Sequence, residues 1–156
     1  MPAEALLVPS AVEASVHVSA PVVFAGFGVT APERGYDDNA GHDEAGKIVA
    51  ILSNAPAALP SELRAHYASN EQKLRTAADH GAVAVLTLLS QDALRRRPWT
   101  ALKARAAQPS MTWTNDDGSP GPVERRIRAT GYLNQDGAAR LFAGAAHWYL
   151  LPRRGA

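Results

Sequence analysis

Two short apolar runs separated by a capped helical segment constrain the fold of this chain more than any other feature. Residues 47–52 and 82–89 are almost continuously apolar, which is typical of strands that are covered on both faces. Between them, Ser69 and Gln72 have the spacing of a capping box, and an apolar stripe continues to Gly81 at the expected C-cap. The order strand, helix, strand predicts two parallel strands joined by a crossover, and therefore an α/β fold.

Weaker patterns predict the other elements. Before the central unit, we expect a half-buried strand over 12–19, a strand over 22–28 with glycines near its end, and an ordered loop over 31–46. After it, we expect a helix from Ser90 to near Pro98, a strand over 111–114 and an imperfectly alternating segment over 123–133. A last helix is expected after Asn134, with a buried stripe formed by Ala138, Leu141, Phe142 and Ala145. No repeat or boundary is visible. The chain therefore divides into one domain at residues 11–146 and two loosely held tails, 1–10 and 147–156.

Composition removes several classes of function. With 156 residues and no cysteine, the chain suits one domain without disulfides, thiolate metal sites or cysteine nucleophiles. Sixteen basic residues against fifteen acidic ones give a net charge of +1, so no global field attracts nucleic acid or an anionic membrane. No apolar run approaches the ~20 residues that span a bilayer, and the first twenty residues lack a secretory signal pattern. We expect no nucleic acid and no membrane as partners.

The candidate motifs for cofactor and metal binding are weak. Gly26 and Gly28 follow an apolar strand as in a dinucleotide-binding turn, but Pro32 and Gly35 arrive where the helix should run, which favours a bulged strand end. Three adjacent side chains at residues 42–44 (His, Asp, Glu) rarely converge on one ion, so we expect a solvated loop there. The common hydrolase and kinase signatures are absent from the sequence.

Two alternatives remain open. A self-sufficient hydrolase could assemble a site from His42, Asp43 and the Asp79-His80 pair, although a histidine at that helix end is also a good C-terminal cap. A single-strand nucleic-acid site could combine two arginine clusters with two tryptophans, namely Arg95, Arg96, Arg97, Arg125, Arg126 and Arg128 with Trp99 and Trp113. The balanced total charge favours a solvated surface for these arginines.

Two spaced series of residues follow one another along the chain. The first series comprises residues 23–28, Ala31-Pro32-Glu33 and Tyr36-Asp37-Asp38. The second comprises residues 46–49, Lys73, Ala77 and Gly81-Ala82. Each piece alone is common, but the ordered set spans roughly residues 20–145. Together the two series resemble the protease-associated domain that is inserted in di-zinc aminopeptidases of the transferrin-receptor and glutamate-carboxypeptidase clan.

This resemblance implies a three-layer β/β/α swivelling-domain fold, with core strands containing Phe24, Ile48, Val49, Val85 and Leu86 and a covering helix at 70–80. It also implies a non-catalytic module that acts as a lid, a substrate-access element or a docking surface. Zinc is then expected only in a parent catalytic domain, and no cofactor is expected in this chain. The expected partners are a peptidase catalytic domain or a peptide or protein substrate. A parent of this family would be secreted or periplasmic.

The chain departs from the family between residues 54 and 69, where a proline-interrupted connection replaces a segment that often contains cysteine. Within the expected module, the candidate interaction surface comprises the long loop and two aromatic residues: Tyr36, Asp37, Asp38, Tyr67 and Trp113. Aromatic residues at such positions also commonly cap a core.

Overall fold

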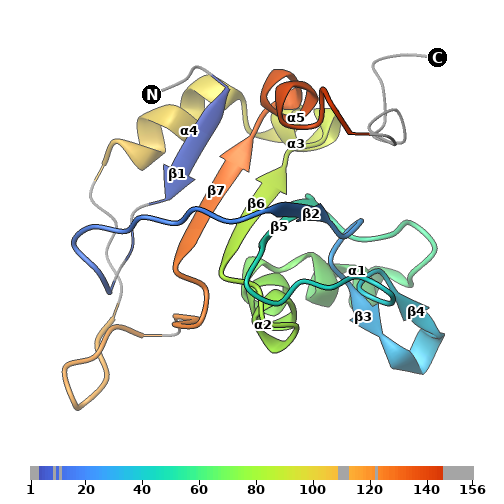
Figure 1. The fold of residues 1–156 in the computed structure, drawn as a ribbon, viewed down its shortest axis with the longest axis horizontal. Helices are drawn as coiled ribbons and strands as arrows, with labels where there is room; N and C mark the ends of the chain where they lie inside the picture. Colours follow the sequence, from blue (N-terminus) through green and yellow to red (C-terminus); the bar gives the residue numbers. More distant parts are fainter. Residues whose placement is uncertain (1–3, 9, 11, 109–112, 122, 146–156) are drawn as a thin grey trace.

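The α/β class is confirmed by the computed structural model, which describes residues 4–8, 10, 12–108, 113–121 and 123–145. Its centre is a five-stranded sheet with the order β1-β7-β6-β5-β2, and β3 and β4 form a separate pair (Figure 1). The strands are β1 Ala5–Val8, β2 Val22–Phe24, β3 Thr30–Ala31, β4 Tyr36–Asp37, β5 Ile48–Leu52, β6 Ala84–Leu88 and β7 Ala129–Leu133. Strands β2, β5, β6 and β7 are parallel, whereas β1 is antiparallel to β7.

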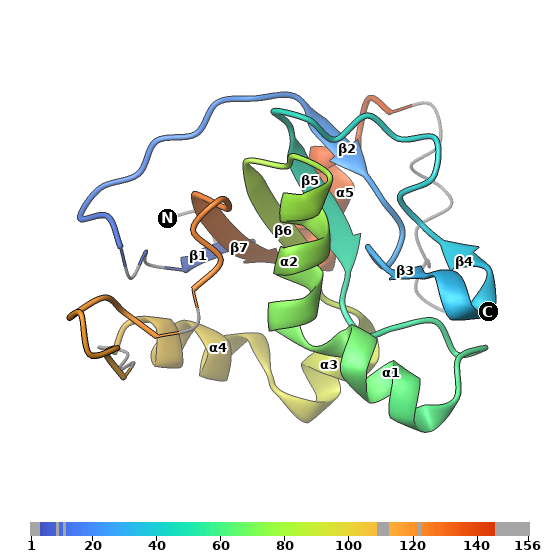
Figure 2. The same ribbon diagram turned by 90° about the horizontal axis from the view of Figure 1, so that it is seen from below.

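Helices cover both faces of the five-stranded sheet. They are α1 Ser61–Ala68, α2 Asn70–Asp79, α3 Gln91–Arg96, α4 Trp99–Ala106 and α5 Gln135–Leu141, with a 3-10 turn η1 at Pro32–Arg34. Figure 2 shows α2 and α5 on opposite sides of the sheet. The finer β/β/α order of layers implied by the resemblance stays an expectation.

The β5–α2–β6 unit forms as the sequence predicts. Ser69 caps α2, because its hydroxyl accepts a hydrogen bond from the Gln72 amide, and Gly81 follows the helix with φ +83°. Strands β5 and β6 pair in parallel with Val49 opposite Val85, and both side chains are only 1% exposed. Alanines of α2 pack onto this face of the sheet and close the main core.

The opposite face is covered by α5. Asn134 caps this helix by accepting a hydrogen bond from the Gly137 amide, as expected. Ala138 is buried and Phe142 packs edge-on against Phe24 with ring centroids 5.9 Å apart, but Leu141 is 38% exposed and Ala145 is exposed. The predicted stripe is therefore right at Ala138 and Phe142 and wrong at the other two positions, and the helix ends at Leu141.

Three predictions about the chain's path are wrong. Residues 12–19 form no strand, since their side chains are exposed or half-buried and no neighbouring strand pairs with them. The first ten residues are not simply a loose tail, because β1 pairs with β7 from Ala5↔Leu133 to Val8↔Thr130. The proline-interrupted stretch after Asn54 contains α1, whose Leu63 and Tyr67 lie one turn apart on one face and pack inward.

Some predictions fall outside the described residues. The tail 147–156 and the first half of the expected strand 111–114 lie there, while Thr114 forms an isolated bridge with Pro120. Within the described part of the chain, no helix is long and apolar enough to cross a membrane.

Candidate functional site

The carboxylate of Asp38 organises the loop that carries the first motif series. Its Oδ2 accepts hydrogen bonds from the backbone amides of Phe27 at 2.9 Å and Val29 at 3.3 Å, and its Oδ1 accepts one from the Tyr36 hydroxyl at 2.7 Å. The Asp38 amide in turn donates to the Val29 carbonyl at 2.9 Å. Asp38 therefore binds the end of the β2 segment to the β3–β4 pair.

Two glycines make room for this arrangement. Gly26 has φ +48°, and a β-carbon there would lie 2.5 Å from Asp38 Oδ1. Gly28 has φ +65°, and a β-carbon there would lie 2.7 Å from the Ile51 side chain. The glycine pair thus serves a close backbone approach at a strand end, as the sequence favoured, rather than a dinucleotide turn.

Lys73 of α2 is the second centre of this network. It is 4% exposed, and its ammonium donates to the carbonyls of Phe27 at 2.7 Å and Leu52 at 2.8 Å. Burial lowers the pKa of Lys73 to about 8, while the nearby Asp38 carboxylate raises it. In the sequence, Lys73 lies four residues before Ala77, on the apolar side of α2. A lysine on the apolar side of a helix indicates a buried cation with hydrogen-bond partners.

The two candidate tyrosines lie together in a small second core. Tyr67 is 8% exposed and belongs to a cluster with Val29, Ala31 and Leu59, against which Tyr36 also packs. The Tyr67 hydroxyl donates to Glu33 Oε1 at 2.9 Å. Burial, and then the hydrogen bond to Glu33, raises the pKa of Tyr67. Burial, and then the hydrogen bond to Asp38, raises the pKa of Tyr36, so both hydroxyls remain neutral donors.

The other candidate surface residues are separated. Asp37 is exposed, and its carboxylate accepts hydrogen bonds from the Thr30 hydroxyl and the Asn39 amide, which lowers its pKa. Trp113 is 63% exposed and lies on the 113–121 loop, which both views show at the opposite end of the molecule from β3 and β4 (Figures 1 and 2). The structure thus brings Tyr36, Asp38 and Tyr67 together and leaves Trp113 apart.

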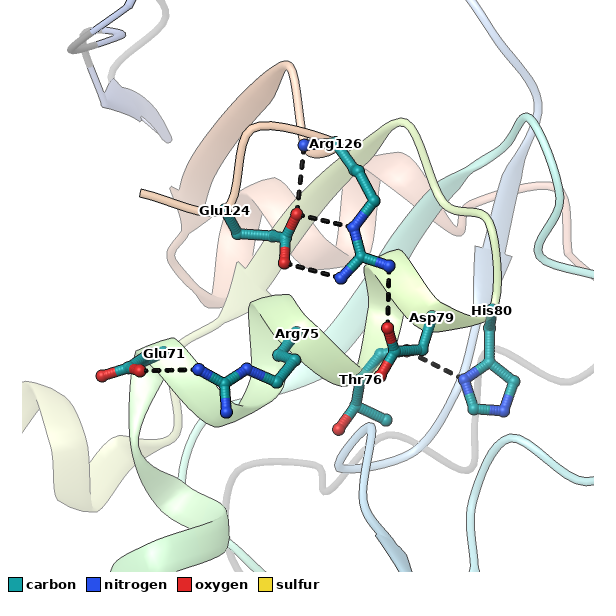
Figure 3. Close-up of polar contacts among 7 residues, drawn as sticks. All are labelled: Glu71, Arg75, Thr76, Asp79, His80, Glu124 and Arg126. Carbon is teal, nitrogen blue, oxygen red and sulfur yellow. Dashed lines mark hydrogen bonds and ion pairs between the residues drawn. The ribbon is translucent and has the colours of Figure 1, made fainter. Parts of the chain in front are cut away.

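The Asp79-His80 pair does not form a catalytic dyad in this structure. Asp79 Oδ1 pairs with Arg126 at 2.8 Å, and the same guanidinium binds Glu124 (Figure 3). His80 Nδ1 lies 2.8 Å from the Thr76 carbonyl, so it caps the end of α2. Each side chain has a structural partner of its own.

The histidines and arginines singled out in the sequence have the following surroundings. Among the described residues, no group of three or more histidine, aspartate or glutamate side chains could hold a metal ion. Several arginines of the two clusters are ion-paired at the surface: Arg95 with Asp92, Arg126 with Asp79 and Glu124, and Arg128 with Glu13.

Glu44 corrects the expectation of a solvated loop at residues 42–44. His42 and Asp43 are exposed, but Glu44 is 2% exposed and neither of its carboxylate oxygens has a hydrogen-bond partner among the described residues. Burial raises the pKa of Glu44, against the opposing effect of His80 and His42. Sequence alone gave no signal for this burial, because the surrounding residues form a turn-rich loop.

We expect Glu44→Gln to stabilise the protein at neutral pH. As pH rises above the ordinary pKa of glutamate, the unfolded chain loses this proton before the folded protein does, so the wild type loses stability in that window. Glutamine removes the ionisation, and the expected gain is about 1 kcal/mol at pH 7.5, with no gain near pH 4. Urea unfolding of both proteins at the two pH values measures it. The exposed Glu62→Gln is the control, and an equal gain at both pH values contradicts the explanation.

Comparison with known proteins gives a distant similarity of structure. No protein-family model matches the chain, and no curated protein matches it. Among solved structures, the aminopeptidase from Aneurinibacillus sp. strain AM-1 is similar with a TM-score of 0.42 and 22% sequence identity over 90% of this chain. The similar region is 27% of that protein, so this chain spans about a quarter of its length.

Proposed function

We propose that this chain is a non-catalytic accessory domain of the protease-associated type, which limits access to a zinc aminopeptidase site or docks a protein partner. The observation that carries the proposal is that residues of the two motif series hold neighbouring elements of the fold together. Asp38, Lys73 and Tyr36 are polar members of the two motif series, and their hydrogen bonds hold β2, β5, α2 and the β3–β4 pair together. Residues that carry the resemblance therefore have structural roles in this chain, which supports the proposal.

The position of the candidate catalytic residues supports the same conclusion. Asp79 is paired with Arg126, His80 caps α2 and Asp43 pairs with Lys47 at 3.0 Å. A general base must lie within hydrogen-bond reach of a nucleophile or substrate that it serves. The bonds that these residues make are those of a folded surface.

We expect the purified chain to show no zinc-dependent hydrolysis of aminoacyl-p-nitroanilides. The assay compares the chain with added zinc, with a chelator, and as the double variant His42→Ala and His80→Ala. Chelator-sensitive activity that the double variant lacks would establish the hydrolase alternative instead. A complementary observation is the coding sequence on both sides of this chain: a catalytic domain with zinc ligands is expected, and neighbours unrelated to any peptidase would count against the proposal.

A further inference from the structure

A groove of about 790 Å³ lies on the α2 face of the sheet, between α2 and the segment formed by α3 and α4. Its floor is a row of paired positions across three strands, Thr87 of β6, Tyr132 of β7 and Leu6 of β1. The same row continues to Ile51 of β5, which α2 buries to 2% exposure. Helix α2 covers one end of the row, and Leu102 and Ala106 of α4 line the other side.

The charge of this groove is one-sided. Four cationic side chains line it, Lys73, Arg96, Arg97 and Arg105, and the described lining contains no aspartate or glutamate. The whole chain has sixteen basic and fifteen acidic residues, so this segregation is local. The three arginines are exposed and belong to different parts of the α3–α4 segment. A concave site lined by charges of one sign concentrates ligands of the opposite sign.

The groove also has the position expected of a binding site in a parallel sheet, outside the carboxyl ends of the strands. Ser53 and Asn54 follow β5 directly, and Ser90 follows β6 after one residue. The Ser53 hydroxyl accepts a hydrogen bond from the Ser90 amide at 2.9 Å, and Arg96 donates to Asn54 Oδ1 at 3.4 Å. These contacts hold the two loops and one arginine at the end of the groove.

The chemistry of the lining favours carboxylates over nucleic acid. Single-strand nucleic-acid sites stack bases on aromatic side chains, whereas Tyr132 is the single aromatic residue in the described lining. Guanidinium groups bind carboxylates through paired hydrogen bonds. The leucine, valine and alanine side chains of the lining suit an apolar side chain between two acidic ones.

We propose that this groove binds an acidic peptide segment, with Arg96, Arg97 and Arg105 receiving its carboxylates and the Thr87–Tyr132–Leu6 row receiving its apolar side chains. The choice of a peptide rests on the proposed function, because an accessory domain of a peptidase meets peptides and proteins. The observations of the cationic lining and of the Thr87–Tyr132–Leu6 row do not depend on the proposed function.

The test is fluorescence anisotropy with a labelled heptapeptide of alternating glutamate and leucine. We expect saturable binding that weakens with salt, and a rise in Kd of roughly tenfold for Arg96→Glu and for Arg105→Glu. Arg95→Glu is the matched control, because Arg95 neighbours Arg96 on α3 and pairs with Asp92 but does not line the groove. The Kd of the Arg95→Glu variant should change by about twofold at most, since an exposed charge that does not line the groove acts on the peptide only through solvent and salt.

Two further probes and one spectrum complete the design. A peptide with glutamine in place of glutamate should not bind, and oligothymidylate should bind more weakly than the acidic peptide. Amide shifts of the isotope-labelled wild type should change at Thr87 and Tyr132 on titration, a readout that needs no variant.

The proposal is overturned if the acidic peptide does not bind, if Arg95→Glu weakens binding as much as Arg96→Glu, or if oligothymidylate binds more tightly. A failure of peptide binding leaves the hydrolysis result of the proposed function unchanged, so the two are separable.

Discussion

Lys73→Met is expected to destabilise the protein by about 2–4 kcal/mol, although it removes a charge from the interior. Burying an ion pair often costs as much as it returns, and an apolar replacement of both partners can then be stabilising. Here the partners are the backbone carbonyls of Phe27 and Leu52, which no side-chain substitution can remove. Methionine fills a similar volume but leaves both carbonyls without a donor, at roughly 1–3 kcal/mol for each buried group.

Thermal unfolding measures this effect. A loss of this size corresponds to a fall in Tm of roughly 2–4 °C per kcal/mol in a chain of this length. The exposed Lys103 of α4 provides the control, and Lys103→Met should change Tm little. A Lys73→Met protein as stable as the wild type would mean that the two carbonyls find other donors.

The pH dependence of the wild type gives a second measure of Lys73. Its pKa in the folded protein is about 8, below the ordinary lysine value of 10.5, so above pH 8 the unfolded chain binds more protons than the folded protein. Stability attributable to this group therefore rises with pH between about 8 and 10. The neutral amine still has two N–H donors for the two carbonyls, so no hydrogen bond has to be lost. Lys73→Met should lack this rise.

Asp38→Ala is expected to have the largest effect of all, about 3–5 kcal/mol or the local unfolding of residues 26–40. The substitution removes the acceptor for the amides of Phe27 and Val29 and for the Tyr36 hydroxyl. Three donors then lose their partner at once, which places the variant among the severe class of point substitutions. The β3–β4 pair is only two residues long in each strand, so its own ladder contributes little to holding this loop.

Hydrogen exchange distinguishes the two outcomes for Asp38→Ala. Local unfolding removes protection from the 26–40 segment alone, while global destabilisation lowers protection in β5 and β6 as well. Asp38→Asn keeps one acceptor oxygen and should lose less stability. Asp92→Ala removes an exposed aspartate and should stay within about 0.5 kcal/mol of the wild type. Native-like protection of the 26–40 segment in Asp38→Ala would contradict the role assigned to this carboxylate.

Local sequence was sufficient where a pattern and its cap occur together. The Ser69 and Asn134 caps, the start of α3 at Ser90, and the parallel pairing of the two apolar runs are confirmed, because each depends on contacts within a few residues or on burial of both strand faces. The sequence patterns do not predict helices α1 and α4. Both helices follow a proline, which indicates a break in the chain, although a helix can also begin directly after one.

Tertiary structure alone decided which of these residues meet. The alternation over 12–19 predicts a strand, but a strand also needs a partner to pair with, and this segment has no place in the order β1-β7-β6-β5-β2 of the sheet. The burial of Glu44 and the one-sided charge of the groove likewise depend on segments far apart in the chain. The sequence by itself determined the α/β class and the β5–α2–β6 unit, because periodicity and capping are local. The network of Asp38 and Lys73 and the cationic groove arise from long-range packing, which no local pattern encodes.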